Sequence, residues 1–534
     1  MRDINKNWSF VKEHIEQFPE YKSAIFEQGF LLTNTQCEFG DQFPFYGNWR
    51  EVSLCESVHL YLHINQKAYV LNKNEVTYFL IGHAYDPFGY EAHENKLLEK
   101  LSDLCGGEFD KGIDYINDWT GLFVLGIIKG GNVTICGDYT SMRTAYYGVI
   151  EGRWYVTSHE ELIALRENLT RDGHVSRFEN YRWYHFYGEG LPGDIGHYHE
   201  LNKLMSNTYV TYSCETFSLR RFYPKCEIKM IDTEEKYDNA VKHIAEIMKS
   251  TLELIAAKWN MPAISSTGGR DSKGTIAAAY HIKDKFLYYS YNSQLAEKVD
   301  CDAAKEICDA ISVSHKTYDI PLEKSDYSEY DLVKAILHVN SNRVYFNHND
   351  IMKRIFLRKT VPFDIELKSW VSEMGRAFYY VKYGVKRMQK KPSERRVNAL
   401  NNIYLFRPAL MLWADRIYAD YMKRTSMQDQ IFNYDWTDIA FCEFRYGRWG
   451  TEVISCEHMF SNDVTIPYNN RHLAEIMMSV PLKKRINSQT HIDFTKYLCP
   501  EIDKLNINIK DLNHDKKRMW LDKVYYFTTL IRPI

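Results

Sequence analysis

Residues 262–274 read PAISSTGGRDSKG, and this stretch decides the fold of the second half of the chain. Residues 262–265 are apolar enough for a buried strand, and residues 275–280 continue with a helical pattern. Between them, Gly268 and Gly269 let the backbone turn tightly and approach an anion, while the next helix presents unpaired N–H groups. A strand, a glycine turn and a helix in this order predict a polyphosphate site.

The side chains of this turn suit a nucleotide. Thr267 and Ser272 can donate hydroxyl hydrogen bonds to phosphate oxygens, and Asp271 can hold the Mg²⁺ that neutralises them. Ser265 ends the strand that leads into the turn. The spacing differs from the P-loop pattern GxxxxGK[ST], and no lysine directly follows Gly269. The alternative is a chance glycine turn with polar neighbours.

Further elements flank this stretch on both sides. A long amphipathic segment at residues 234–259 predicts a helix before it. After it we expect strands at 285–291 and 314–320 with a helix at 302–311 between them. Strands alternating with helices predict a parallel sheet covered on both faces. Helical patterns dominate the rest, with a solvated basic loop at 386–396 and a docked terminal helix.

The first part of the chain reads differently. Short alternating runs such as residues 75–82 and 122–128 predict strands, and residues 94–101 and 160–165 predict helices. This pattern indicates an α+β layered-sheet domain. We therefore expect a first domain at residues 1–226 and a second, α/β domain with a helical C-terminal part at residues 233–534.

Composition limits the classes of function. The 534 residues are 45% hydrophobic and 26% charged, which is typical of a globular protein of more than one domain. A net charge of -3 gives no support for nucleic-acid binding. Eleven cysteines without a CxxC pair favour reduced thiols, and no apolar run of about 18 residues predicts a membrane span. We expect a cytoplasmic protein without a signal peptide.

The second half resembles the asparagine synthetase family, which includes the β-lactam synthetases. The family's ATP pyrophosphatase loop reads Ser-Gly-Gly-x-Asp-Ser, and here Thr267 replaces the first serine. Ser290 and Tyr291 stand where the family contacts adenine. Residues 299–308 resemble its Pro-Asp-x-x-x-Ala helix, and residues 464–481 resemble its Val-Pro-Phe-Leu-Asp helix. The resemblance implies an α/β fold that binds ATP and Mg²⁺.

The family's second loop, Ser-Gly-Glu-Gly-Ala-Asp-Glu, corresponds by position to residues 369–380. Ser372, Glu373 and Gly375 could cup the pyrophosphate there, and Arg376 adds a guanidinium where the family has an acid for a second Mg²⁺. An ordinary helix N-terminus is the alternative. The family also uses a late lysine, for which Lys510 is the first candidate, with Lys504 next; either could equally be a surface lysine.

The first half resembles the family's glutaminase domain in residues 118–123, 136–140 and 154–162. A working glutaminase of this type needs a cysteine directly after the initiator methionine, because the free α-amino group assists the thiol. Position 2 is Arg2, and the nearest thiol, Cys37, is internal. The resemblance therefore implies a degenerate glutaminase-like domain.

Together these features predict an ATP-dependent amide-forming ligase that adenylates a small-molecule carboxylate and transfers it to ammonia or an amine. Asp271, Glu373 and Lys510 are the predicted catalytic residues. One rival is a degenerate homologue that binds a nucleotide or partner without turnover, and another is an ATP pyrophosphatase that modifies RNA. A homodimer stays open.

Overall fold

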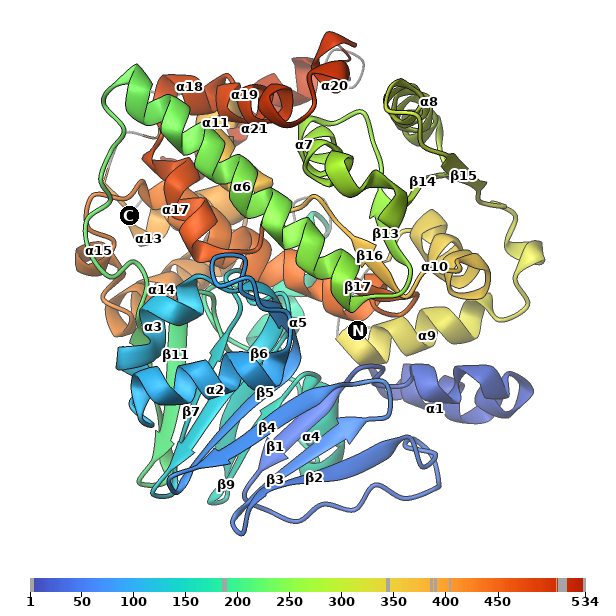
Figure 1. Ribbon diagram of the computed structural model, residues 1–534. Coiled ribbons are helices and arrows are strands. Elements are labelled where there is room, and N and C mark those ends of the chain that lie inside the picture. The colour runs from blue at the N-terminus through green and yellow to red at the C-terminus, as the bar shows by residue number, and fades with distance from the viewer. Residues whose placement is uncertain are drawn as a thin grey trace.

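The protein is described by a computed structural model at residues 4–184, 190–341, 346–384, 388, 391–402, 405–505, 507 and 516–531. Antiparallel sheets lie in the lower part of Figure 1 and a parallel sheet with many helices lies in the upper part. This arrangement confirms the predicted order, α+β first and α/β with a helical C-terminal part second. No helix in the described ranges is long and apolar enough to cross a membrane.

The first half contains two six-stranded antiparallel sheets. In spatial order the first consists of β10 (Asn202–Lys203), β8 (Tyr146–Ile150), β9 (Arg153–Thr157), β1 (Phe30–Thr33), β3 (Val58–His63) and β2 (Trp49–Cys55). The second consists of β12 (Thr216–Arg221), β11 (Thr208–Ser213), β7 (Asn132–Gly137), β6 (Thr120–Lys129), β5 (Val76–Tyr85) and β4 (Ala68–Lys73). Buried side chains from both sheets, including Phe30, Phe79, Val124 and Trp154, form one apolar layer between them.

Helices cover the outer faces and ends of these sheets. They are α1 (Ile4–His14), η1 (Ile15–Gln17), η2 (Pro19–Ala24), α2 (Glu94–Cys105), α3 (Phe109–Asn117), α4 (Glu160–Glu167) and α5 (Gly173–Glu179). Leu97, Leu98 and Leu101 of α2 are fully buried, as their three- and four-residue spacing predicts. The helices predicted at 94–101 and 160–165 are therefore confirmed.

The second half is built on a five-stranded parallel sheet. Its order is β15 (His315–Asp319), β14 (Leu287–Asn292), β13 (Pro262–Ser265), β16 (Ile365–Leu367) and β17 (Asp463–Thr465). The helix α6 (Glu234–Lys258) crosses between this sheet and the antiparallel sheets in Figure 1. It begins where the Thr233 hydroxyl accepts the Lys236 N–H. Because carboxyl ends of parallel strands meet at one edge, the turn after β13 lies beside the segments that follow β14, β16 and β17.

The remaining elements are short helices around this sheet. Those before the second turn are α7 (Arg270–Ala279), η4 (Tyr280–Lys285), α8 (Leu295–Ala310), η5 (Lys324–Asp326), α9 (Tyr330–Ser341) and α10 (His348–Thr360). Then come η6 (Ser372–Arg376), α11 (Phe378–Tyr383), α13 (Glu394–Asn401), α14 (Pro408–Arg424), α15 (Met427–Gln430), α16 (Trp436–Ala440), η7 (Phe441–Gly450) and η8 (Val453–His458). Last are α17 (Arg471–Ser479), α18 (Leu482–Ile486), α19 (Gln489–Leu498), α20 (Pro500–Lys504) and α21 (Lys516–Leu530).

Two sequence predictions in this half need correction. The helix expected at 302–311 begins seven residues earlier, since α8 starts at Leu295. The segment 386–396 is not loop to its end, because α13 begins at Glu394, where the Ser393 hydroxyl accepts the Arg396 N–H. Lysines and arginines are good helix formers, so charge alone does not distinguish a loop from a solvated helix end.

The two halves share one hydrophobic core. A single buried cluster contains Trp119 and Leu122 of the first half together with Ile244, Ile264 and Tyr468 of the second. The residues that follow Tyr468 connect the halves further. The division into one domain that ends at residue 226 and another that begins at residue 233 stays a prediction. The apolar contact between the two halves is continuous.

The connecting residues are Asn469, Asn470 and Arg471. The Asn469 amide donates to the Gly121 carbonyl at 2.8 Å and to the Asp138 carboxylate at 2.8 Å. The buried Arg471 guanidinium donates to the Asp138 carbonyl at 3.0 Å. The motif found from sequence at 464–481 thus holds the segments at 118–123 and 136–140, which the sequence analysis selected separately.

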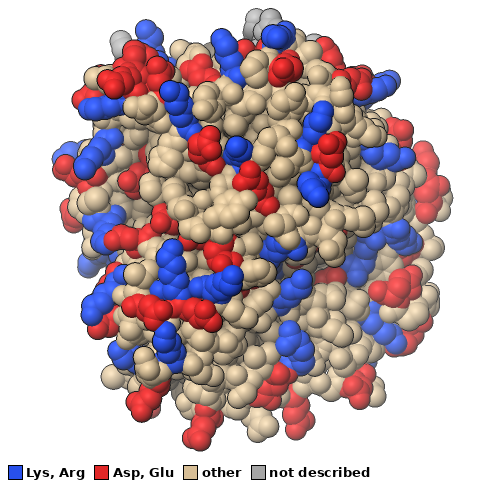
Figure 2. Space-filling model, viewed as in Figure 1, with Lys and Arg blue, Asp and Glu red and all other residues tan. Residues whose placement is uncertain are grey.

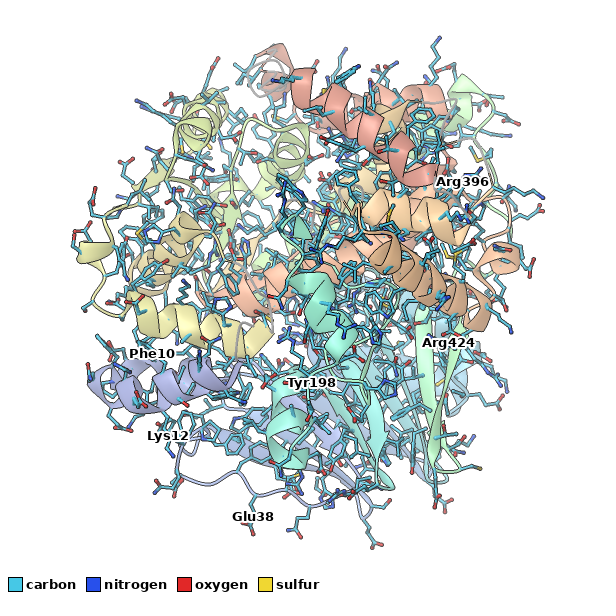
Figure 3. All side chains as sticks on the ribbon, turned by 180° about the vertical axis from the view of Figure 1, so that it is seen from behind. Phe10, Lys12, Glu38, Tyr198, Arg396 and Arg424 are labelled. Carbon is cyan, nitrogen blue, oxygen red and sulfur yellow. The ribbon has the colours of Figure 1, made fainter. Side chains whose placement is uncertain are left out.

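Two charge pairs also cross from one half to the other. Arg221 of β12 forms a two-pronged ion pair with Glu443 of η7, and both side chains are fully buried. Arg424 of α14, labelled in Figure 3, donates to both carboxylate oxygens of Asp194 at 3.0 and 2.6 Å. Such pairs fix the orientation of the halves because each buried charge needs its partner.

Removing one partner of the buried pair should destabilise the whole chain. We expect Glu443→Ala to lower the free energy of unfolding by about 3–5 kcal/mol, because Arg221 is left as an uncompensated buried charge. Chemical denaturation measures this loss. The exposed pair of Lys111 and Glu108 is the control, and Glu108→Ala should leave the free energy of unfolding nearly unchanged. Equal losses in the two variants would contradict the role given to Glu443.

A buried histidine makes stability depend on pH. His197 Nδ1 lies 2.5 Å from Glu160 and its Nε2 lies 3.2 Å from Glu179. Burial disfavours the charged ring, but the two carboxylates outweigh it and raise the pKa of His197 from 6.5 to about 9. The protonated ring therefore stabilises the fold fully below about pH 6.5, and this contribution is lost as pH rises through about 9.

We expect the free energy of unfolding to fall by on the order of 3 kcal/mol between about pH 6.5 and 9.5, and His197→Gln to remove most of this dependence. Urea unfolding at several pH values measures it. His199, which is exposed in the adjacent sequence, supplies the control variant His199→Gln. A pH dependence that survives in His197→Gln would show that other groups cause it.

Charges are mixed over the face of the molecule that Figure 2 shows. Basic and acidic side chains alternate across the face in Figure 2, and no large area carries a single sign. This distribution agrees with the net charge of -3. The eleven cysteines, all in the described ranges, are free thiols, as their spacing predicts, and eight of them are buried.

Candidate functional site

The turn after β13 leads directly into α7. Within it, the Thr267 N–H donates to the Ser272 hydroxyl at 2.9 Å, and the Gly269 N–H donates to the Thr267 hydroxyl at 3.3 Å. Gly269 precedes α7 and offers no side-chain cap. The first N–H groups of α7 therefore have no acceptor from a capping side chain, which is the arrangement that binds phosphate at helix ends.

Three cationic side chains surround this helix end. Arg270 donates to the Asn487 carbonyl at 2.9 Å, and Lys273 donates to the Ile507 carbonyl at 2.7 Å. The third is Arg376, which comes from the turn after β16. Their positive charge adds to that of the helix end, so the site favours an anion with several negative charges.

Asp271 is the centre of the site. Its carboxylate accepts two hydrogen bonds from the Arg376 guanidinium, at 2.8 and 2.7 Å, and one from the Ser372 hydroxyl at 2.5 Å. His491 Nε2 lies 3.8 Å away. Burial by itself would raise the pKa of Asp271, but Arg376, His491 and these hydrogen bonds lower it below its ordinary value. Asp271 is therefore a carboxylate that holds Arg376 in place.

The turn η6 carries Ser372, Glu373 and Arg376. It is bounded by Val371 at φ 74° and Ala377 at φ 49°, both in the left-handed region. A β-branched residue such as Val371 rarely adopts this conformation, and such strain is concentrated at functional sites. The Val371 N–H donates to the Tyr446 hydroxyl at 3.0 Å, and this hydrogen bond helps to hold the turn.

Glu373 lies beside Asp271 and accepts a hydrogen bond from the Tyr446 hydroxyl. Burial and then the negative charge of Asp271 raise the pKa of Glu373 to about 7. Near neutral pH this carboxyl exists in both forms, which suits a group that accepts or donates a proton. Tyr446 belongs to η7, a π-helical segment, and π-helical turns occur frequently at functional sites.

The structure thus brings Asp271 together with Ser372, Glu373 and Arg376, which follow it in the sequence by about one hundred residues. We call these four residues, with Tyr446, Tyr468 and His491, the Asp271 cluster. Sequence reasoning missed the last three. Tyr468 donates to the Asp271 carbonyl at 3.2 Å and belongs to the 464–481 motif, which was the available signal. Tyr446 and His491 had no local signal, since only tertiary packing brings them here.

Gly375 is explained by packing. A Cβ at this position would lie 3.1 Å from the Met477 side chain and 3.3 Å from His491 Cε1. Gly375 is buried, and it faces α17 and α19 instead of solvent. The predicted contact of Gly375 with pyrophosphate stays a prediction.

Ser290 and Tyr291 point to opposite faces of β14, as consecutive strand residues do. The Ser290 hydroxyl donates to the Ser266 carbonyl at 2.5 Å, next to the glycine turn. The Tyr291 ring instead lies under two ammonium groups. The ring centroid is 4.4 Å from Lys353 Nζ and 5.5 Å from Lys368 Nζ. Of the two predicted adenine contacts, the Ser290 side chain is therefore adjacent to the turn and the Tyr291 ring is on the other face.

Comparison with known proteins gives no family for the chain. No protein-family model matches the sequence, and no curated protein matches it. Similar solved structures include glutamine phosphoribosylpyrophosphate amidotransferase from B. subtilis complexed with ADP and GMP, at 9% identity and TM-score 0.23, covering 63% of this chain and 91% of that chain. Another, titled as the allosteric regulatory enzyme of purine biosynthesis, has 8% identity and TM-score 0.24, covering 63% and 92%. At these TM-scores the similarity carries no inference about activity.

The metal prediction can be tested against the ligands present. Within the described residues, no group of three or more His, Cys, Asp or Glu side chains could hold a metal ion. Both Asp271 oxygens already accept hydrogen bonds from Arg376. The residues present therefore do not fit a resident Mg²⁺ ion. Mg²⁺ stays a prediction as the ion that accompanies ATP, which needs few protein ligands because it keeps its waters and the phosphates.

Two further predictions concern residues outside the cluster. Lys510 and Arg2 lie outside the described residues, and Lys504 ends α20. Cys37 is buried, its Sγ lies 3.3 Å from the Thr35 carbonyl, and burial raises the pKa of its thiol to about 11. A thiol with this pKa is a poor nucleophile at neutral pH. The absence of glutaminase activity stays a prediction.

Proposed function

We propose that this chain is an ATP-dependent ligase that activates a carboxylate as its adenylate and transfers the acyl group to an amine or ammonia. The observation that supports it most is the pairing of two groups at one helix end. The cationic Arg376 lies beside the first turn of α7, where it pairs with Asp271, and Glu373 lies close to both with a pKa of about 7. The first suits a leaving polyphosphate and the second suits removal of a proton from an amine.

In the first step a substrate carboxylate oxygen attacks the α-phosphorus of ATP. The bond from that phosphorus to the bridging oxygen breaks, and pyrophosphate leaves with the electron pair. The N–H groups at the start of α7 and the guanidinium of Arg376 stabilise the charge that develops on pyrophosphate. Asp271 and Ser372 act before this step, because their hydrogen bonds fix the position of Arg376 and of the turn.

In the second step an amine nitrogen attacks the acyl carbon of the adenylate. The bond from that carbon to the phosphate oxygen breaks, and AMP leaves. The nitrogen must lose a proton, and the carboxylate form of Glu373 is placed to accept it. Tyr446 donates a hydrogen bond to this carboxylate and so favours its charged form. Ammonia and a primary amine satisfy this step equally, so the amine is defined by class alone.

Product analysis tests the reaction. The protein is incubated with ATP, Mg²⁺ and a panel of carboxylic acids and amines, and released nucleotides are separated. AMP and pyrophosphate in equal amounts are expected, with an acid-dependent rate. Release of ADP and phosphate instead would exclude adenylation. Glutamate release from glutamine is measured in parallel and should stay at the background level.

Asp271→Asn should lower the rate of AMP release by about 10²–10³-fold, because Arg376 loses the anion that orients it for the phosphates. The fold should persist, since the substitution preserves shape. Circular dichroism and the melting temperature check this. Asp331→Asn, at an exposed carboxylate of α9 away from the turn, is the control and should keep most of the activity. A full rate in Asp271→Asn would remove Asp271 from the site.

The second candidate is nucleotide binding without turnover. One observation favours it, namely that Arg376 already engages both oxygens of Asp271, which the family would use for metal. Titration of ATP with and without Mg²⁺ separates the two functions. Affinity that does not change with Mg²⁺, together with no AMP, supports the binding protein.

A further inference from the structure

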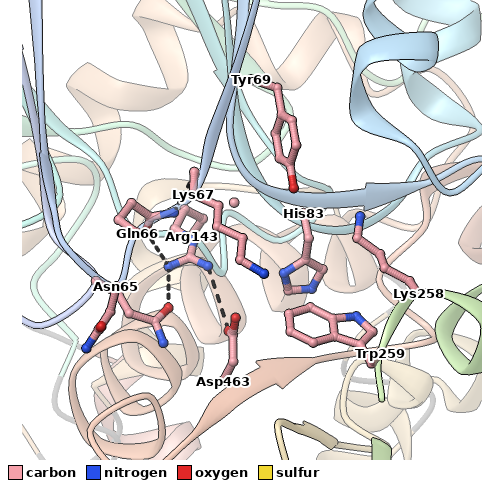
Figure 4. Close-up of a pocket in the computed structure, with 11 residues that line it drawn as sticks. Asn65, Gln66, Lys67, Tyr69, His83, Arg143, Lys258, Trp259 and Asp463 are labelled. Atoms are coloured by element: carbon pink, nitrogen blue, oxygen red, sulfur yellow. Dashed lines mark hydrogen bonds and ion pairs between the residues drawn. The ribbon is translucent and has the colours of Figure 1, made fainter. Parts of the chain in front are cut away.

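A second polar site lies between the two halves of the chain. It is a pocket lined by Lys67, His83 and Arg143 from the first half and by Lys258, Trp259 and Asp463 from the second (Figure 4). Lys258 and Trp259 precede β13, and Asp463 begins β17. The pocket is therefore at the amino ends of these strands, whereas the Asp271 cluster lies beyond their carboxyl ends.

Arg143 supplies a donor that the protein does not use. The side chain is only 3% exposed, and its Nη1 donates to Gln28 at 3.1 Å and to Gln66 at 3.0 Å. Its Nη2 lies 4.0 Å from the Asp463 carboxylate. Its Nε is buried and has no acceptor among the described residues. A buried guanidinium N–H without a partner is costly, which indicates that a ligand or water accepts from it.

His83 supplies a second such group. It is 3% exposed, and its buried Nε2 has no hydrogen-bond partner among the described residues. Burial first, and then the charges of Lys258, Arg143 and Lys67, hold the pKa of His83 well below its ordinary value. The ring is therefore neutral, and it can place its N–H on Nε2 and donate to an anion.

Lys67 completes the set. Its ammonium lies over the ring of Trp259, 5.0 Å from the centroid, and it forms no ion pair within the described ranges. Figure 4 shows this ammonium directed between Arg143 and His83. Groups from three strands or loops thus converge on one space, in which donors predominate over acceptors.

The charges around the pocket do not balance. Lys258 is paired with Glu94, and Asp463 is the one carboxylate among the residues that line the pocket, although Asp138 behind the lining also acts on Arg143. Positive charge therefore predominates along the lining, which favours a small anion. The cavity volume is about 20 Å³, far below the roughly 300–1,000 Å³ typical of pockets for drug-sized ligands. A nucleotide is therefore too large, and a ligand of a few atoms fits.

We propose that this pocket binds a small monocarboxylate, whose oxygens accept from Arg143 Nε, His83 Nε2 and the Lys67 ammonium. Two oxygens in one plane suit a guanidinium edge better than a spherical anion does. The ligand contacts both halves and so adds an interaction across their interface. The proposal is independent of the ligase activity, because no residue of the Asp271 cluster lines the pocket.

Acetate is the probe, and saturation-transfer NMR of its methyl group on the full-length protein is the measurement. We expect saturable binding with a dissociation constant of about 1–10 mM, within the limit for a ligand of four heavy atoms. Lys67→Gln should weaken it at least tenfold, whereas Lys67→Arg, which keeps the charge, should stay within about threefold. Lys111→Gln, at an exposed lysine on α3, is the matched control and should bind as the wild type does.

Three outcomes would overturn the proposal. They are the absence of saturable binding in the wild-type protein, equal binding in Lys67→Gln, and displacement of acetate by an equal concentration of chloride. ATP titration of Lys67→Gln is run beside these measurements and should match the wild type. Loss of acetate binding with unchanged ATP binding assigns the effect to the pocket, whatever the outcome at the Asp271 cluster.

Discussion

Arg376→Gln should reduce the rate of AMP release by about 10²–10³-fold, which is the loss caused by removing one preorganised donor from a developing negative charge. The guanidinium is held by two hydrogen bonds to Asp271, at 2.8 and 2.7 Å, and it lies beside the end of α7. Glutamine is too short and carries no charge, so pyrophosphate leaves without this stabilisation. Steady-state kinetics with saturating ATP and acid measure the change.

Two further variants show whether charge or shape matters at this position. Arg376→Lys retains the charge but not the planar guanidinium with its several donors, and it should recover part of the rate. Arg396→Gln, at an arginine of α13 labelled in Figure 3, should have no effect. A rate in Arg376→Gln within threefold of the wild type would mean that Arg376 only stabilises the turn and does not act on the phosphates.

Glu373→Gln should reduce amide formation by about 10²–10⁴-fold, the usual contribution of a general base. In the wild type the rate should rise with pH through about 7, because the carboxylate form accepts the proton and the pKa of Glu373 is about 7. The variant should lose this rise while still exchanging pyrophosphate with ATP, since the first step does not use Glu373. Pre-steady-state product analysis separates the two steps.

Neighbours of Glu373 should move this pH profile in opposite directions. The Tyr446 hydrogen bond lowers the pKa of Glu373, so Tyr446→Phe should shift the rise to higher pH. The charge of Asp271 raises it, so the residual activity of Asp271→Asn should rise at lower pH. A profile that stays in place in both variants would assign the titration to another group.

The framework of the second half could be predicted from sequence because its signals are local. The strand β13 and the turn that follows it agree with the sequence, since three apolar residues and paired glycines leave few alternatives. The helix α6 ends one residue before its predicted end. The start of α8 was predicted too late because its first turn, from Leu295, has no side-chain cap to mark it.

The site could be predicted only in part, for a different reason. Asp271 was found from the order of strand, glycine turn and helix, and the turn at 372–376 was found from its position in the family's pattern. The structure shows that each follows a strand of the same parallel sheet, and the edge of such a sheet brings them together. The engagement of Asp271 by Arg376 could not be predicted, since the turn that carries Arg376 begins after a left-handed Val371, which no local sequence signal indicates. Tyr446 and His491 reach the cluster from helices that carry no motif.

Tyr468 and the three residues after it contact both halves of the protein. Tyr468 contacts the Asp271 backbone, and Asn469 to Arg471 hold the antiparallel sheets. A shortened gene that encoded only the half with the Asp271 cluster would leave these polar groups without their partners, one residue away from Tyr468 of that cluster. The antiparallel half thus supports the other half structurally, and deletion or truncation at the boundary should yield insoluble protein instead of a folded fragment.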